Sequence, residues 1–114
     1  MFLEPEELQI VRDILAFYAK GREVWAFGSR VTGQHLKKFS DLDLVVMGDV
    51  AMPIREYARI KDAFTLSSLP FRVDVLDWSA VSPEFRKIID ANYEVVQSGG
   101  ENNTADNTMR LGNN

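Results

Sequence analysis

Residues 27–46 read FGSRVTGQHLKKFSDLDLVV, and the expected fold is built around this segment. It starts at the end of an apolar run, EVWAF at residues 23–27, which predicts a short buried strand. Residues 28–40 are polar, basic and punctuated by glycine, which predicts a loop with room for one helical turn. The run DLDLVVM at residues 41–47 predicts a second strand. The stretch is therefore expected to form two strands joined by a polar loop.

The second strand carries two acidic side chains. Because side chains alternate along a strand, Asp41 and Asp43 are expected to project from one face, roughly 6 to 7 Å apart at the backbone. Leu42 and Leu44 then face the core. Two carboxylates on one face repel each other unless a cation lies between them. Since Mg²⁺ takes carboxylate and phosphate oxygens together, the pattern predicts a magnesium site.

A third acid lies in the apolar run PFRVDVLD at residues 70–77, which predicts a third strand. Its neighbours Val73 and Val75 point to the other face, so Asp74 joins the first two acids if the two strands lie side by side. Three carboxylates suit two metal ions, one positioning an attacking oxygen and the other a triphosphate.

Gly28 and Ser29 lie where the first strand gives way to a turn. Glycine lets the backbone approach a phosphate closely, and exposed N–H groups with the serine hydroxyl can hold phosphate oxygens. Arg30, Lys37 and Lys38 add positive charge to the same loop. The turn is therefore a candidate phosphate site.

Several nearby side chains are expected to have structural rather than catalytic roles. Arg72 shares the face of Asp74 and is expected to pair with an acid. Asp77, at the end of its strand, is interpreted as an acid of the following loop or helix approach. His35 is expected to be solvated. Four aromatic residues are interpreted as core rather than as nucleotide-stacking groups: Trp25, Phe27, Trp78 and Phe85.

The remaining segments predict one α/β (α+β) domain at residues 1–97 with a small mixed sheet. Helices are expected at residues 5–20, at 53–67 and from Ser82 onward, where Ser82-Pro83-Glu84 is a strong helix start. A short last strand is expected at residues 93–96. Residues 98–114, SGGENNTADNTMRLGNN, are rich in Gly, Asn and Thr and are predicted to be a disordered polar tail.

The composition narrows the function classes. The chain has 114 residues, a formal net charge of -4 and no cysteine. An acidic balance disfavours a nucleic acid as partner, although divalent cations still let an acidic enzyme bind a triphosphate. We find no signal peptide and no apolar run long enough to span a membrane, so a cytoplasmic location is expected.

The combined pattern resembles the minimal nucleotidyltransferase family of the DNA polymerase β superfamily. That family's signature is Gly-Ser, a spacer with a second Gly, and then Ser-Asp-x-Asp-Leu. Here it reads Gly28-Ser29, Gly33, and Ser40-Asp41-Leu42-Asp43-Leu44, and Asp74 takes the place of the family's third acid one strand later. The resemblance spans residues 24–89. The loop reads SRVTG at residues 29–33, where the family often has Ala-Arg-Gly.

The resemblance implies the nucleotidyltransferase fold, a small mixed twisted sheet with flanking helices. It implies transfer of a nucleoside monophosphate, AMP from ATP, with Asp41, Asp43 and Asp74 as catalytic metal ligands for two Mg²⁺ ions. The nucleotide-binding residues it implies are Gly28, Ser29, Arg30 and Ser40. It also implies a separately encoded helical partner of the HEPN or substrate-binding type, in some pairs a toxin that the transferase silences by adenylylation.

Three alternatives stay open at this point. The acceptor can be a small molecule such as an antibiotic, with this chain as the nucleotide-binding subunit of a two-chain transferase. A homodimer can build the acceptor site between two copies. A non-catalytic binding module would need a decayed triad, and all three acids are present.

Overall fold

The computed structural model describes residues 1–100, and the predicted tail beyond Gly100 lies outside the described residues. The elements in chain order are α1 (Pro5–Tyr18), β1 (Val24–Phe27), α2 (Ser29–Thr32), β2 (Leu42–Val46), α3 (Ile54–Thr65), β3 (Val73–Asp77), the 3-10 helix η1 (Trp78–Ala80), α4 (Pro83–Ala91) and β4 (Tyr93–Gln97). Every predicted helix and strand is present, and α2 is the predicted helical turn.

The four strands form one mixed sheet in the order β3-β2-β1-β4. β1 pairs antiparallel with β2 and with β4, whereas β2 and β3 run parallel. A parallel pair needs a crossover connection, and α3 supplies it here. The predicted mixed sheet with flanking helices is thus confirmed, and β3 and β4 are its two edge strands.

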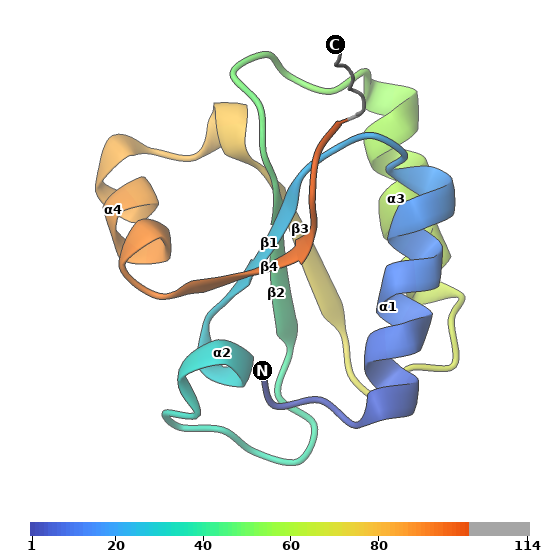
Figure 1. Ribbon diagram of the computed structural model, residues 1–114, viewed down its shortest axis with the longest axis vertical. Coiled ribbons are helices and arrows are strands. Elements are labelled where there is room, and N and C mark those ends of the chain that lie inside the picture. Colours follow the sequence, from blue (N-terminus) through green and yellow to red (C-terminus); the bar gives the residue numbers. More distant parts are fainter. Residues whose placement is uncertain (101–114) are drawn as a thin grey trace, which may run out of the picture.

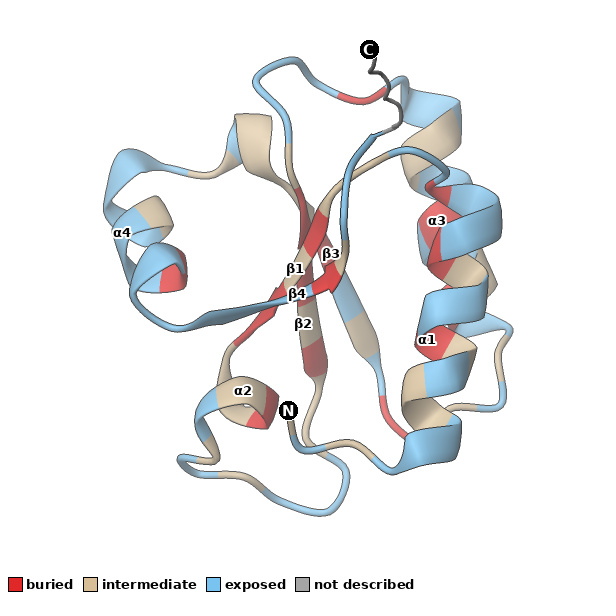
Figure 2. Ribbon diagram, in the orientation of Figure 1, coloured by how far each residue is buried: buried red, intermediate tan, exposed pale blue. Residues whose placement is uncertain are grey.

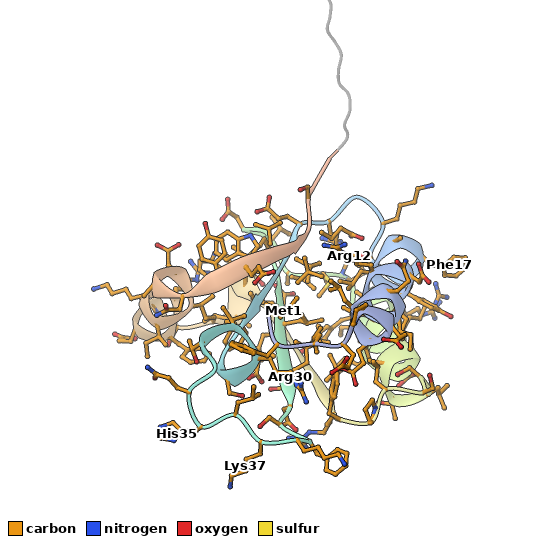
Figure 3. All side chains as sticks on the ribbon, turned by 60° about the horizontal axis from the view of Figure 1, so that its bottom comes forward. Met1, Arg12, Phe17, Arg30, His35 and Lys37 are labelled. Carbon is orange, nitrogen blue, oxygen red and sulfur yellow. The ribbon has the colours of Figure 1, made fainter. Side chains whose placement is uncertain are left out.

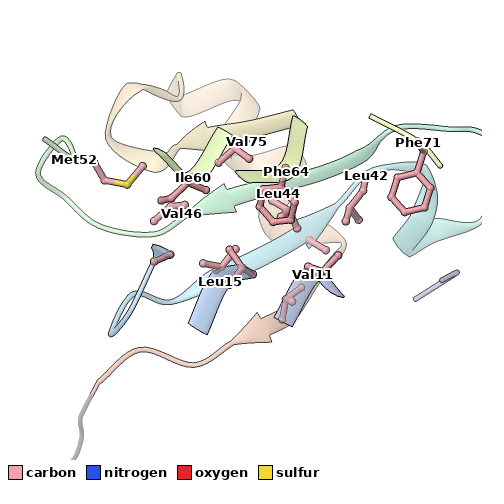
Figure 4. Close-up of a cluster of buried hydrophobic side chains, with 14 residues drawn as sticks. Val11, Leu15, Leu42, Leu44, Val46, Met52, Ile60, Phe64, Phe71 and Val75 are labelled. Carbon is pink, nitrogen blue, oxygen red and sulfur yellow. The ribbon is translucent and has the colours of Figure 1, made fainter. Parts of the chain in front are cut away.

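Helices α1 and α3 cover one face of the sheet (Figure 1). Their inward residues recur at helical spacing: Val11 and Leu15 on α1, and Ile60 and Phe64 on α3, are buried. Figure 2 shows buried residues on the sheet-facing sides of both helices. These side chains meet alternate residues of the strands in the main core (Figure 4): Val24, Ala26, Leu42, Leu44, Val46, Val75 and Val96.

Helix α4 lies over the opposite face of the sheet (Figure 1). It starts as predicted, because the Ser82 hydroxyl accepts a hydrogen bond from the Phe85 N–H at 3.2 Å. Ile89 of α4 packs on Phe27 and Val45 in a second, smaller core. Helices therefore flank the sheet on both faces, α1 and α3 on one and α4 on the other.

The element ends differ slightly from the predicted ones. α1 ends at Tyr18, short of the expected residue 20, and Gly21 with φ +80° leads the chain into β1. Asp41 comes just before β2 and is outside the ladder. At the other end, the Gln97 amide donates to the carbonyls of Ala19 and Arg22, both at 2.9 Å. This contact fixes the end of β4 against the α1–β1 turn.

Among residues 1–100, the helices are too short or too polar to cross a lipid bilayer.

Candidate active site

Asp43 and Asp74 lie side by side in the sheet. They are register partners in the parallel pair of β2 and β3, where neighbouring strands lie about 4.8 Å apart. Leu42, Leu44 and Val75 point into the core under α1 and α3, so alternation places both aspartates on the opposite face, which α4 partly covers. The predicted condition that the second and third strands lie side by side is confirmed, and it makes Asp74 the neighbour of Asp43.

The surroundings of Asp43 disfavour the ionised form of its carboxyl group. Burial raises the pKa of the Asp43 carboxyl to about 6, from a usual value of 3.8, and repulsion from Asp74 and Asp41 adds to the rise. Arg72 acts in the opposite direction. A half-buried carboxyl facing two more carboxylates is a place where a cation is favoured.

Asp41 is held by an arginine. The Arg72 Nη2 donates to Asp41 Oδ2 at 2.9 Å, and this hydrogen bond is the main reason that the pKa of Arg72 is raised. The arginine side chain is 79% exposed and the aspartate side chain 40%, so the pair is solvated. The expectation that Arg72 pairs with an acid is confirmed.

Gly28 packs directly against the Asp43 carboxylate. Its φ of +80° is a conformation that side chains with a β-carbon rarely adopt. A β-carbon built on Gly28 would collide with Asp43 Oδ2 and lie 3.3 Å from Asp43 Cγ. Glycine is therefore required here twice over, because it makes the turn from β1 into α2 and leaves room for the acid.

Ser29 opens the short helix α2 beside this contact. The Gly28 carbonyl accepts hydrogen bonds from Val31 and Thr32, both at 3.0 Å, which fixes the turn. The Ser29 side chain is half-buried, and within residues 1–100 its hydroxyl makes no hydrogen bond. The hydroxyl is thus free for a ligand oxygen next to the acids.

Arg30 is the one buried charged side chain of the described residues, with an exposed fraction of 5%. Its guanidinium donates to the backbone carbonyls of Ser40, Phe2 and Lys38 at 2.8, 2.9 and 3.2 Å. It also stacks 4.0 Å above the centre of the Phe71 ring. Figure 3 shows Arg30 inside the molecule. In this arrangement Arg30 ties the N-terminal segment, α2 and the loop before β2 together, and its donors are taken up by carbonyls rather than offered to a phosphate.

The loop between α2 and β2 presents its other polar groups outward. The Ser40 hydroxyl accepts a hydrogen bond from the Lys37 N–H at 2.8 Å, which closes a turn just before Asp41. Lys37 and Lys38 are exposed, and so is His35, whose φ is +58°. Figure 3 shows His35 and Lys37 at the periphery. The prediction that the His35 side chain is solvated is confirmed.

The acids do not form a closed metal cage. Over residues 1–100, no three acidic or histidine side chains converge closely enough to enclose an ion unaided. Magnesium is usually bound by one or two protein carboxylates together with substrate phosphates and water. The all-oxygen donor set of Asp41, Asp43 and Asp74 and the raised pKa of Asp43 fit an ion that binds together with its substrate.

Two features of the site were missed at the sequence level. The structural role of Arg30 depends on carbonyls up to 28 residues away, which no local pattern reveals. An apolar cleft at the C-terminal end of β3 is lined in part by Leu76 and Phe85. Strand alternation places Leu76 on the face of Asp74 and was the available signal. Asp77, by contrast, caps η1 by accepting from the Ser79 N–H at 3.0 Å, which confirms its interpretation as a helix-approach acid.

Comparison with known proteins identifies the family of the chain. Residues 8–98 match the family model described as "Nucleotidyltransferase domain". The chain is 46% identical over 95 residues to a probable protein adenylyltransferase, MntA, of Haemophilus influenzae, covering 83% of this chain and 82% of that protein.

A solved structure supports the fold. The structure is described as a toxin-antitoxin with AMP-PNP; it is similar with a TM-score of 0.65 and 17% identity, covering 82% of this chain and 74% of that one. The family match and the close relative confirm the resemblance carried by Gly28-Ser29 and the three acids. The chain therefore belongs to the nucleotidyltransferase family and is a transferase of nucleotidyl groups.

Proposed function

We propose that the chain transfers AMP from ATP to a hydroxyl group of a partner protein. The observation that carries the proposal is the row formed by Gly28, Asp43 and Asp74, in which a phosphate-binding turn packs on a carboxylate and that carboxylate pairs with a second one. The name of the 46% identical relative, a probable protein adenylyltransferase, supports AMP as the group and a protein as the acceptor.

Asp41, Asp43 and Asp74 are assigned as ligands of two Mg²⁺ ions. When bound, the ions supply charge neutralisation at the triphosphate and lower the pKa of the attacking hydroxyl. The pKa of Asp43 is raised by burial and, to a smaller extent, by repulsion from Asp74 and Asp41, and this repulsion between neighbouring carboxylates supports the assignment.

The chain's own groups bind the substrate and accept the proton. The Gly28 backbone and the Ser29 hydroxyl hold the β- or γ-phosphate, and Ser40 lines the nucleotide side. Asp74 is exposed and accepts the proton of the acceptor hydroxyl. That oxygen forms a bond to the α-phosphorus as the bond to the bridging oxygen breaks, and pyrophosphate leaves. Arg30 supports the nucleotide site by fixing the loops around it rather than by touching phosphate.

The acceptor is assigned to a second chain, a separately encoded helical protein of the HEPN or substrate-binding type, in the cytoplasm. The structural neighbour is a toxin-antitoxin, which supports a pair of chains. The expected role is therefore that of an antitoxin that modifies its toxin.

The test is co-expression with the protein of the adjacent reading frame, followed by intact mass measurement with ATP and Mg²⁺. We expect a mass gain of one or more AMP units on the partner, abolished by Asp43→Asn. Asp49→Asn, which changes an exposed turn acid, is the matched control and should retain transfer. A stable complex with no mass gain would favour a partner that presents small substrates, and no complex would overturn the two-chain assignment. Calorimetric titration with ATP, with and without Mg²⁺, tests nucleotide binding alone.

A further inference from the structure

The sheet order arranges the site along one line. Gly28 and Ser29 follow β1, Asp43 is on the neighbouring β2, and Asp74 is on β3, which is an edge strand. The phosphate-binding turn and Asp74 are thus at opposite ends of the row. No strand of the described chain continues the sheet beyond β3.

This strand order sets the direction from which the acceptor approaches. The inference of that direction rests on the proposed function. In phosphoryl transfer the attacking and leaving oxygens are roughly in line on opposite sides of the phosphorus. If the leaving pyrophosphate is held at Gly28 and Ser29, the attacking hydroxyl must come from the opposite side. That side is the β3 edge, where Asp74 is exposed.

An apolar cleft of about 620 Å³ opens at this edge. Leu76 lies on the same face as Asp74 and about 7 Å along the strand, so the cleft begins next to the proposed proton acceptor. Phe85 of α4 forms its other wall; the residue is 36% exposed, and its ring packs edge-to-face on Phe27 at 5.7 Å between centroids. The apolar lining includes Tyr57, Leu76, Ala80, Val81 and Phe85.

The cleft favours an apolar side chain over a charged or strand-like occupant. The Tyr57 hydroxyl donates to the Val75 carbonyl at 2.6 Å, so this carbonyl of the edge is taken and a fifth strand is blocked there. Asp77, the acidic residue of the lining, already accepts hydrogen bonds from Met52 and Ser79. A polycationic small molecule therefore finds no free carboxylate in the cleft.

We propose that this cleft binds an apolar side chain of the acceptor protein, next to the residue whose hydroxyl is modified. The occupant docks through that side chain between Leu76 and Phe85, which places the neighbouring hydroxyl at Asp74. The cleft is then a specificity site for the acceptor and takes no part in holding ATP.

The first test uses variants that alter the cleft in two opposite ways. Phe85→Ala enlarges it, and Ala80→Phe fills it from an exposed position. Both should raise the KM for the acceptor protein about tenfold, the usual effect of losing one central apolar anchor, and leave the affinity for ATP unchanged. The controls are Ile88→Ala, which truncates an exposed residue of the same helix, and Ala91→Phe, which adds a ring at the exposed end of α4. Both controls should keep the parent KM.

The second test needs no acceptor protein. N-acetyl-phenylalaninamide should shift the methyl NMR resonances of Leu76 and Val81 in the parent chain and not in Ala80→Phe. The proposal would be overturned if adenosine shifts these resonances and the phenylalanine probe does not, or if both cleft variants lose ATP affinity. Either result would make the cleft a nucleoside site. If the parent chain transfers AMP to no protein, the proposed function fails and the assignment of the cleft to an acceptor protein fails with it; transfer at the parent rate with an unchanged acceptor KM in both cleft variants overturns the cleft assignment alone.

Discussion

The α-carbon of Gly28 lies against the carboxylate of Asp43, so the turn proposed to bind phosphate is in direct contact with the central acid. The two residues come from adjacent antiparallel strands: Asp43 is the register partner of Phe27, the residue before the glycine. A side chain on residue 28 would strike the carboxylate. The sequence signature of the site therefore reflects a steric requirement between its two halves.

Gly28→Ala is expected to abolish transfer and to destabilise the fold by about 1 to 3 kcal/mol, the cost of an unfavourable positive φ. Gly21→Ala is a matched control, because Gly21 has the same φ of +80° and no atom within 4 Å of the added β-carbon. Gly21→Ala should lose less stability than Gly28→Ala, because it lacks the collision with Asp43, and it should keep its activity. The measurements are denaturant unfolding and transfer rate; equal loss of activity in both variants would contradict the role of the Asp43 contact.

Asp43→Asn is expected to stabilise the metal-free protein at neutral pH. The pKa of Asp43 is raised from 3.8 to about 6, so the carboxyl favours the folded state while protonated, and this contribution is lost as the pH rises through about 6. After a discount for partial exposure, the stability difference between variant and parent should grow by about 1 to 2 kcal/mol from pH 4 to pH 7.

The measurement is urea unfolding in EDTA at several pH values. Mg²⁺ added together with ATP should stabilise the parent and have little effect on the variant. A stability difference between variant and parent that does not depend on pH would show that the pKa of Asp43 is not raised in the folded protein.

Ser29→Ala is expected to weaken binding of ATP with Mg²⁺ by about 1 to 3 kcal/mol, the range for a lost hydrogen bond to a charged group. The stability without nucleotide should not change, because the hydroxyl has no partner within residues 1–100. Calorimetric titration measures the affinity, and Ser68→Ala, an exposed serine in the loop before β3, is the control. Parent-like affinity in Ser29→Ala would move the phosphate site elsewhere.

Arg30→Lys is expected to cost about 2 to 4 kcal/mol of stability, since the ammonium cannot reach the three carbonyls that the guanidinium joins. Arg12→Lys, at an exposed position of α1, should be neutral. Thermal unfolding checks both. If Arg30→Lys keeps parent stability and loses ATP binding, Arg30 contacts phosphate after all.

Arg72→Gln is expected to raise the pKa of Asp43 further, because the arginine charge acts to lower it. The stability should hardly change, since exposed ion pairs contribute little. NMR titration of the Asp43 carboxyl in metal-free protein measures the shift, with Arg59→Gln on the outer side of α3 as the control. A pKa of Asp43 that is equal in both variants would contradict the proximity of Arg72.

The parts of the site that the sequence predicted are those that depend on local geometry. Alternation along β2 and β3 is enough to place Asp43 and Asp74 on one face, and a glycine before a serine marks the turn after β1. The parallel pairing that makes the two acids neighbours was stated only as a condition, because strand order depends on how α3 packs on α1.

The parts that could not be predicted depend on contacts distant in sequence. The sequence gives Arg30 the appearance of a free loop cation, and only the approach of the Phe2 carbonyl and the Phe71 ring makes it a buried tie. The position of α4 on the acid-bearing face is a similar case. Its apolar residues predict a packed helix but do not reveal which side of the sheet receives it.

The connection through α3 also has a kinetic consequence. The antiparallel pairing of β1 and β2 forms between residues close in sequence, and it alone brings Gly28 to Asp43. Asp74 arrives only after the longer crossover has closed, and non-local parallel pairing is the slower kind of folding event. During refolding, the contact of Gly28 with Asp43 is therefore expected to form before Asp74 reaches its place beside Asp43. Recovery of nucleotide affinity should then precede recovery of transfer.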